Sequence, residues 1–484
     1  MDNNEQIKSK TISGFFWRFA ERCGAQVVSL VVSIVLARLL EPTDYGIISM
    51  VAIFITISQV FVDSGMGSAL VQKKDAGDLE FSSVFYFNIV MCAGIYGILF
   101  VTAPIIAKFY ENEQLTSVIR VLSLTVVISS LKNVQQAYVS KKMLFKRFFF
   151  ATLGGTIMAA VIGIYMAFKG YGVWALVAQQ LTNSIIDTII LWITVKWRPK
   201  KMFSFKKLKE LFSFGWKLLV SSVLHSVYGN LRELIIGKLY SSADLAYYNK
   251  GTQFPNLIVS NINSSIDSVL LPAMSQEQNN VEKVKKMTRR AIKTSSYIMW
   301  PLMLGLAVVA KPLVNLLLTE KWSQTVIFLQ IFCLVYVFEP IQTANLNAIK
   351  ALGRSDIFLK LEVVKKIMGI MILLCTMNFG VLAIALGMLF YTVFVASIMN
   401  SFPNKKLLNY GYIEQIKDIL PAIFLAIFMV IIIYPISYLA LNDISILILQ
   451  IVIGGVVYVL GSKLFELETF NYIVGILKNK LERK

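Results

Sequence analysis

The first half of this sequence recurs in its second half, with an offset that drifts only from 200 to 208 residues. Four groups match in the same order. The first pairs Ala37-Arg38-Leu39 with Gly237-Lys238-Leu239, and an aspartate follows each at the same distance (Asp44 and Asp244). The other three pair Asp63-Ser64 with Asp267-Ser268, Gln135 and Ala137 with Gln342 and Ala344, and Gly172-Val173-Trp174-Ala175 with Gly380-Val381-Leu382-Ala383. In duplicated membrane transporters, substrate sites lie between the repeats near the middle of the bilayer. The repeat therefore predicts two lobes with a site between them.

The composition places both copies in a membrane. The chain has 484 residues, of which 56% are hydrophobic and 15% charged, whereas a soluble protein carries about 25% charged residues. A helix needs roughly 20 apolar residues to cross a bilayer. Fourteen such spans are expected, at about 13–40, 45–71, 82–106, 118–139, 148–168, 172–195, 211–239, 245–272, 291–310, 323–349, 357–377, 380–401, 416–440 and 444–462.

Lysine and arginine are concentrated in every second loop. Dense groups follow the even-numbered spans, as at Lys141-Lys142 and Lys200-Lys201. The alternate loops hold far less, with one lysine (Lys169) after the fifth span, none after the eleventh and one aspartate (Asp443) after the thirteenth. Positively charged loops stay in the cytoplasm, so both termini are predicted to be cytoplasmic and the number of spans to be even. The net charge of +19 then serves topology and attraction to anionic lipids, and nucleic acid is not expected as a partner.

We predict an all-α integral membrane protein in which two six-helix lobes are related by a pseudo-twofold axis along the membrane normal. The lobes are assigned to residues 1–200 and 201–404. Residues 405–484 add two C-terminal helices without repeat partners and an amphipathic helix on the inner membrane surface, since apolar residues recur at helical spacing from Leu467 to Leu481. Val281, Val284 and Met287 suggest a second, shorter surface helix.

Polar stripes run along the first two spans of each copy. The first and seventh spans carry cations and amides at helical spacing, and the second and eighth carry amides that end in an aspartate. Charged residues inside a membrane are functional candidates by default. The candidate substrate-binding residues are Arg18, Arg22, Gln26, Lys217, Tyr228, Arg232, Asn256 and Asn263, and the candidate coupling or gating residues are Asp63, Asp267, Asp187 and Glu339.

Structural alternatives stand beside these roles. Arg18 lies near enough to the end of its span to reach the inner headgroups, and Glu21 offers it or Arg22 an ion-pair partner. Glu233 does the same for Arg232. The aspartates and Glu339 could instead link helices without touching a substrate. The only histidine, His225, could instead be packed as a polar side chain.

The sequence lacks the motifs for nucleotide hydrolysis and for metal binding. The sequence contains no GxxxxGK[ST] loop for nucleotide hydrolysis, and one histidine cannot supply a metal site. The four cysteines have no paired spacing, so neither disulfides nor metal sites are expected. The predicted outward loops are too short to build an enzyme active site. No cofactor, metal or catalytic residue is therefore expected.

Three segments resemble bacterial polysaccharide flippases of the Wzx type, in the multidrug/oligosaccharidyl-lipid/polysaccharide superfamily. They are Gly14-Phe15-Phe16-Trp17, Leu36-Ala37-Arg38-Leu39-Leu40 with Pro42-x-Asp44-Tyr45-Gly46, and Gly65-x-Gly67-Ser68-Ala69-Leu70-Val71-Gln72. Leu271-Pro272-Ala273 and Gly172-Val173-Trp174-Ala175-Leu176 extend the resemblance, which covers residues 10–400.

The resemblance implies a transporter, not an enzyme, in the bacterial inner membrane. Its substrate would be an undecaprenyl-diphosphate-linked oligosaccharide of O-antigen, capsule or exopolysaccharide, moved to the outer leaflet by alternating access. A polysaccharide polymerase and other assembly proteins are implied partners besides the lipid bilayer. Similar flippases bind the diphosphate through arginines near the start of the first helix, where Arg18 and Arg22 stand here; Arg232 corresponds through the internal repeat. The alternative is a cation-coupled exporter of drugs or small molecules, which would favour acidic cavity walls.

Overall fold

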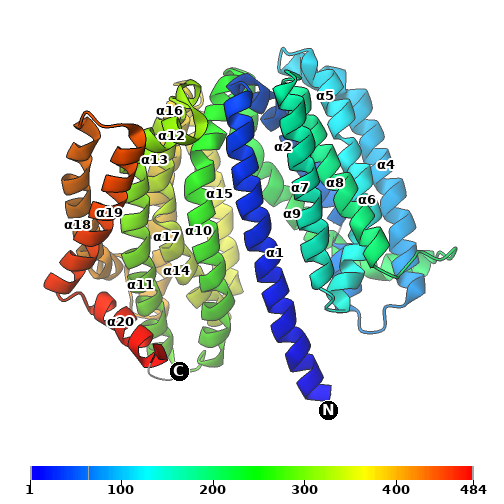
Figure 1. Cartoon of the computed structure of the whole chain (residues 1–484). Helices are drawn as coiled ribbons and strands as arrows, with labels where there is room; N and C mark the ends of the chain where they lie inside the picture. The colour runs from blue at the N-terminus through cyan, green and yellow to red at the C-terminus, as the bar shows by residue number, and fades with distance from the viewer. Residues whose placement is uncertain (1–2, 64, 482–484) are drawn as a thin grey trace. The chain divides into compact units, whose positions relative to one another are not determined.

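The computed structural model describes residues 3–63 and 65–481, and every regular element in that part of the chain is a helix (Figure 1). Packing divides the chain into two compact units, Met1–Ala246 and Tyr247–Lys484. The helices of the first are α1 (Asn3–Leu39), α2 (Pro42–Asp63), α3 (Met66–Gln72), α4 (Asp78–Phe109), α5 (Gln114–Leu122), α6 (Leu124–Lys141), α7 (Lys146–Phe168), α8 (Val173–Thr194) and α9 (Phe205–Leu239). This confirms an all-α protein.

The second unit begins in the first turns of α10 (Ser242–Gln276). It continues through α11 (Val281–Val308), α12 (Ala310–Leu318), η1 (Glu320–Trp322), α13 (Thr325–Tyr336), α14 (Glu339–Ala351), α15 (Ser355–Thr376), α16 (Val381–Phe390), the π-helical turn η2 (Tyr391–Ala396), α17 (Ser397–Leu407), α18 (Tyr412–Ile433), η3 (Tyr434–Tyr438), α19 (Asp443–Leu464) and α20 (Glu468–Leu481). The repeat-based lobes 1–200 and 201–404 stay a prediction.

In the described residues, eleven segments, some formed by two consecutive helices, are long and apolar enough to cross a membrane, and the apolar part of α1, Cys23–Leu39, adds a shorter one. α1, α9 and α15 correspond to the expected spans at 13–40, 211–239 and 357–377, and none of the three is among the eleven. The many membrane-spanning helices are therefore confirmed, and the number of fourteen stays a prediction.

One sequence expectation is wrong. Val281, Val284 and Met287 do not belong to a separate surface helix, because they form the first turns of the continuous α11. Val284 is completely buried and the α11 face that carries it packs into the core around Met274 and Ile292. The C-terminal helix predicted from Leu467 onward is present as α20.

The repeated aspartates explain why α2 and α10 begin where they do. The Asp44 carboxylate accepts a hydrogen bond from the Glu41 backbone N–H at 3.2 Å, and Asp244 accepts one from the Ser241 N–H at the same distance. The Ser241 hydroxyl in turn accepts from the Asp244 N–H at 3.1 Å. These are capping contacts that satisfy helix-terminal N–H groups without partners in the helix. The repeated motif thus encodes a helix start.

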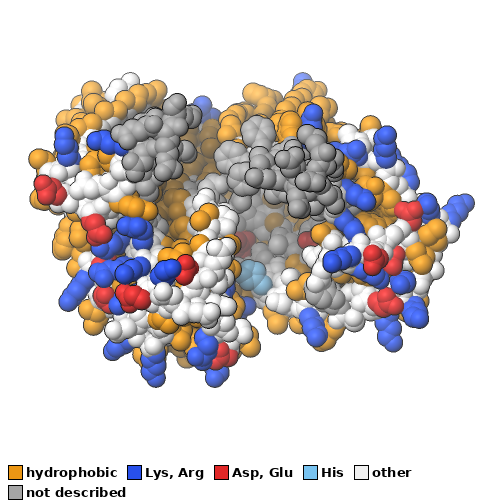
Figure 2. Space-filling view, turned by 90° about the horizontal axis from the view of Figure 1, so that it is seen from below, with side chains coloured by type: hydrophobic (Ala, Val, Ile, Leu, Met, Phe, Trp, Pro, Cys, Tyr) orange, Lys and Arg blue, Asp and Glu red, His pale blue; other side chains and the backbone are white. Residues whose placement is uncertain are grey.

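The internal repeat is also visible in the packing within each unit. α4 packs on α6 and α7 on α8, as their repeat counterparts α11 and α14, and α15 and α16, do in the second unit. Many Lys and Arg side chains are visible in the space-filling view of Figure 2. A short helix precedes α6 and its counterpart α14: α5, which ends at Leu122, precedes α6, and α13, which ends at Tyr336, precedes α14. Duplicated sequence has therefore produced duplicated local architecture.

Candidate functional site

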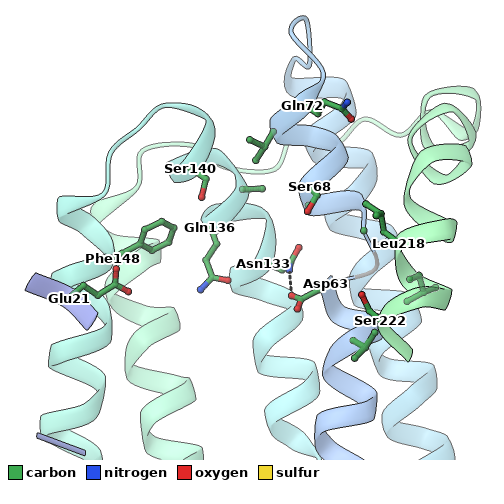
Figure 3. A pocket seen from close by; sticks show the side chains of 16 residues that line it. Glu21, Asp63, Ser68, Gln72, Asn133, Gln136, Ser140, Phe148, Leu218 and Ser222 are labelled. Atoms are coloured by element: carbon green, nitrogen blue, oxygen red, sulfur yellow. Dashed lines mark hydrogen bonds between the residues drawn. The ribbon is translucent and has the colours of Figure 1, made fainter. Parts of the chain in front are cut away.

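A cavity of about 800 Å³ opens within the first unit. Its wall is formed by α1, α2, α3, α6, α7 and α9 (Figure 3). The polar side chains that line it are Glu21, Asp63, Ser68, Gln72, Asn133, Gln136, Ser140 and Ser222. They present hydroxyl, amide and carboxylate groups, which together donate and accept hydrogen bonds. Such a lining suits a ligand rich in hydroxyl groups.

The break between α2 and α3 shapes this wall. Gly65 has a φ of +66°, the left-handed region in which glycine is favoured. A Cβ atom at Gly65 would lie 2.5 Å from the backbone oxygen of Gly215 on α9. Two glycines therefore let the backbones of the break and of α9 approach each other, and α3 then forms one side of the cavity.

A chain of hydrogen bonds holds Asp63 in place. The Asn88 amide of α4 donates to Asn133 Oδ1 at 3.3 Å, and the Asn133 amide of α6 donates to Asp63 Oδ1 at 3.1 Å, the contact drawn in Figure 3. Asn88 is fully buried, whereas the Asp63 side chain is exposed in the cavity wall. Because a hydrogen bond to an ionised group is stronger than one between neutral groups, this relay fixes the carboxylate.

The second carboxylate of the wall comes from the first helix. Glu21 Oε1 accepts a hydrogen bond from the Thr152 hydroxyl of α7 at 3.0 Å. Arg18 and Arg22 stand one turn before Glu21 and directly after it along α1, but their side chains lie outside the described residues. The described lining thus contains acids and neutral polar groups, and the predicted cationic contribution of Arg18 and Arg22 stays a prediction.

The second unit repeats the aspartate–asparagine pair. The Asn347 amide of α14 donates to Asp267 Oδ1 of α10 at 2.7 Å, as Asn133 of α6 does to Asp63 of α2. Four residues before Asp267, the Asn263 amide donates to Glu339 Oε2 at 3.4 Å. The structure therefore brings three predicted residues of the second unit, Asn263, Asp267 and Glu339, into one contact region between α10 and α14.

The other predicted residues lie elsewhere. Gln26 is half-buried on α1, Lys217 is exposed on α9, and Asn256 is exposed on α10. On α9 the Arg232 guanidinium lies 5.8 Å from the centre of the Tyr228 ring, a cation–π contact. Of the predicted residues whose side chains are described, Asp63 alone lines the cavity; α9 contributes Leu218, Leu219 and Ser222 instead.

Asp187 of α8 is engaged by a partner that the sequence reasoning did not select. The Lys132 ammonium of α6 lies 2.6 Å from Asp187 Oδ2, and the two side chains are only 18% and 13% exposed. Lys132 is a charged residue inside the predicted span 118–139, so the criterion that selected Asp187 applies equally to it. Asn133 and Asn347 carried no such signal, because an uncharged amide in a span is unremarkable until its partner is known.

We expect the Lys132–Asp187 pair to show strong non-additivity in stability. Lys132→Met alone and Asp187→Leu alone should each lower the free energy of unfolding by about 3 kcal/mol, because each leaves a largely buried charge without its partner. The double variant should lose less than either single variant. Thermal melting of the purified proteins in detergent measures this, and a double variant whose loss equals the sum of both single losses would contradict the ion pair.

The sequence of this chain is similar to those of two curated proteins. The teichuronic acid biosynthesis protein TuaB of Bacillus subtilis (strain 168) is 24% identical over 72% of this chain and 73% of its own length. The lipopolysaccharide biosynthesis protein WzxC of Escherichia coli (strain K12) is 24% identical over 82% of this chain and 81% of its own.

Among solved structures, the lipid II flippase MurJ in an inward closed conformation superposes with a TM-score of 0.76 over 93% of this chain and 98% of its own, at 16% identity. This likeness concerns the fold. A family model described as "Polysaccharide biosynthesis protein" matches residues 35–327, more than half of the sequence. The chain is therefore a member of this family of polysaccharide biosynthesis proteins.

Proposed function

We propose that this protein is a flippase that moves an undecaprenyl-diphosphate-linked oligosaccharide from the inner to the outer leaflet by alternating access. The observation that carries the proposal is a cavity of about 800 Å³, lined by amides, hydroxyls and carboxylates, inside a helical membrane protein of a polysaccharide biosynthesis family. Sugar hydroxyls both donate and accept hydrogen bonds, so a mixed lining of this kind suits them. The names of TuaB, WzxC and MurJ support a polysaccharide precursor on a lipid.

The diphosphate needs cations that the described cavity lining does not supply. Arg18 and Arg22 flank Glu21 on α1, and Glu21 lines the cavity. Guanidinium groups bind phosphate bidentately, and lysine does not reproduce that geometry. We assign the headgroup contact to Arg22, with Arg18 beside it and Arg232 on α9 as a further candidate. Asp63 and Asp267 are the proposed coupling residues, because each is held by an asparagine of a neighbouring helix.

The experiment uses a strain whose own copy of the gene is deleted. Arg22→Ala is expected to abolish display of the glycan at the cell surface and to leave lipid-linked oligosaccharide accumulating inside, because the diphosphate loses its bidentate partner. Arg22→Lys should restore display only partly. Glycan display is measured by surface staining, with immunoblots for protein in the membrane. Normal display by Arg22→Ala at normal protein level would remove this arginine from the site.

We further propose that the protein resides in the inner membrane with both termini in the cytoplasm. The Lys-rich loop between α6 and α7 would be inside and the loop between α7 and α8 outside, following the distribution of positive charge. In a cysteine-free background, an impermeant thiol reagent added outside intact spheroplasts should label Lys169→Cys and not Lys141→Cys. The reverse pattern would invert the proposed topology.

A further inference from the structure

A second polar cavity lies in the second unit, far along the chain from the proposed transport site. It has a volume of about 530 Å³ and lies between the first turns of α11 and the C-terminal helix α20. The residues on which the argument rests are Lys286, Arg289, Arg290, Lys293, Glu468 and Tyr472. Four of these six are cations from consecutive turns of α11.

Two of the four cations are already neutralised. The Arg289 guanidinium lies 2.6 Å from an Asp418 carboxylate oxygen of α18, and the Lys293 ammonium lies 2.7 Å from Glu468 Oε2. The hydrogen bond from Lys293 keeps the pKa of the Glu468 carboxyl below its ordinary value, so that carboxylate stays charged. These ion pairs tie α11 to α18 and α20 and give the cavity its walls.

The other two cations remain available to a ligand. Lys286 and Arg290 are exposed and form no ion pair with any residue that the structure describes. The Arg290 guanidinium carbon lies 3.8 Å from the centre of the Tyr472 ring, a cation–π contact that holds the group in place. A guanidinium in a cation–π contact keeps its N–H groups, and two of these can bind a phosphate through parallel hydrogen bonds.

An apolar groove begins beside this cavity. It has a volume of about 330 Å³ and is lined by Pro421, Phe424, Leu425, Phe428, Phe465 and Leu467. Leu467 directly precedes Glu468 of the polar cavity, and Pro421 follows Asp418, the partner of Arg289, by one helical turn. An apolar groove and a cationic cavity whose lining residues are neighbours at the start of α20 match the apolar chain and the charged headgroup of a phospholipid.

We propose that the cavity between α11 and α20 binds the phosphate of an anionic membrane phospholipid, with Lys286 and Arg290 as its ligands and the adjoining groove holding an acyl chain. The occupant is a resident lipid of the inner leaflet, not the transported lipid. Charge complementarity selects an anionic headgroup, because a zwitterionic one brings its own cation to a cavity that already has an excess of them.

Native mass spectrometry of the full-length protein in detergent tests this by titration with phosphatidylglycerol, phosphatidylcholine or inorganic phosphate. Phosphatidylglycerol should bind in preference to phosphatidylcholine. Arg290→Gln and Lys286→Gln should each weaken its binding about fivefold, the usual contribution of one cation near an anionic lipid surface. Lys283→Gln is the matched control: it removes the same charge from the same helix, but Lys283 pairs with Glu277 at 3.1 Å outside the cavity.

A melting-temperature rise on adding phosphatidylglycerol gives an independent readout, and Arg290→Gln should reduce that rise. Three outcomes would overturn the proposal. Lys283→Gln weakening binding as much as Arg290→Gln would indicate general surface attraction. Equal binding of phosphatidylcholine would remove the role of charge. Inorganic phosphate displacing the lipid at equal molar concentration would indicate a phosphate site without a lipid.

Discussion

Gly46→Ala is expected to remove nearly all folded, functional protein from the membrane. Gly46 lies in the first turn of α2, and a Cβ atom there would lie 1.8 Å from the backbone oxygen of Ser242, at the start of α10. Backbone atoms cannot rotate away as a side chain can, so one helix start must move by more than 1 Å. Overpacking that forces backbone shifts costs typically about 1–3 kcal/mol and occasionally more.

The matched control is Gly94→Ala on α4, where a new Cβ meets nothing within 4 Å. That change should be neutral or slightly stabilising, since alanine is favoured over glycine within a helix. Yield of monodisperse protein, melting temperature and surface glycan are the measurements. A Gly46→Ala protein with wild-type yield and melting temperature would show that the two helix starts do not pack backbone to backbone.

Asp63→Ala is expected to reduce transport about 10- to 100-fold, the range that corresponds to losing hydrogen bonds of a charged group. The carboxylate lines the cavity and is oriented by Asn133, itself held by Asn88. The coupling role proposed for Asp63 also requires that its side chain carry charge. Asp63→Asn, which keeps the shape and the hydrogen bond from Asn133, is therefore expected to fold normally and to lose the response of transport to an imposed sodium or proton gradient.

Asn133→Ala distinguishes the effect of the position of the Asp63 carboxylate from the effect of its charge, because it keeps the carboxylate and removes its hydrogen-bond donor. We expect it to lower the transport rate less than Asp63→Ala while retaining the gradient response. Transport is measured in proteoliposomes, and protein amount and melting temperature are checked for each variant. Wild-type transport and gradient response in Asp63→Asn would exclude a coupling role for this carboxylate and leave it a hydrogen-bonding group in the wall.

The repeat and the apolar spans predicted the helical membrane fold, because both are encoded by local sequence. Asp44 and Asp244 were recognisable as a repeated pair, and the structure assigns them to equivalent helix starts. The breaks within the spans were not predicted, since Gly65 owes its role to the close approach of Gly215, 150 residues away in sequence. Hydropathy averaged over about 20 residues cannot detect a contact between residues so far apart in sequence.

Site residues could be predicted from the sequence only where they are charged residues inside a membrane span. Asp63, Asp267 and Asp187 stood out as acids inside spans, and all three have polar partners in the structure. The partners Asn133 and Asn347 could not be selected, because the pairing of α2 with α6 and of α10 with α14 is tertiary. The same limit applies to Arg290. Cations after the even-numbered spans were assigned to topology, and only the cation–π contact with Tyr472, 182 residues later, gives Arg290 a further role.

Reconstitution into liposomes tests the central claim most directly. Purified protein is placed with a fluorescent undecaprenyl-diphosphate oligosaccharide, and an impermeant glycosidase reports the leaflet that each molecule occupies. Moving one charge through 100 mV is worth about 2.3 kcal/mol, so an imposed potential or a sodium or proton gradient should change the rate. We predict protein-dependent movement of the labelled lipid between leaflets. No movement above protein-free liposomes under any of the three gradients, with the protein folded, would contradict the account.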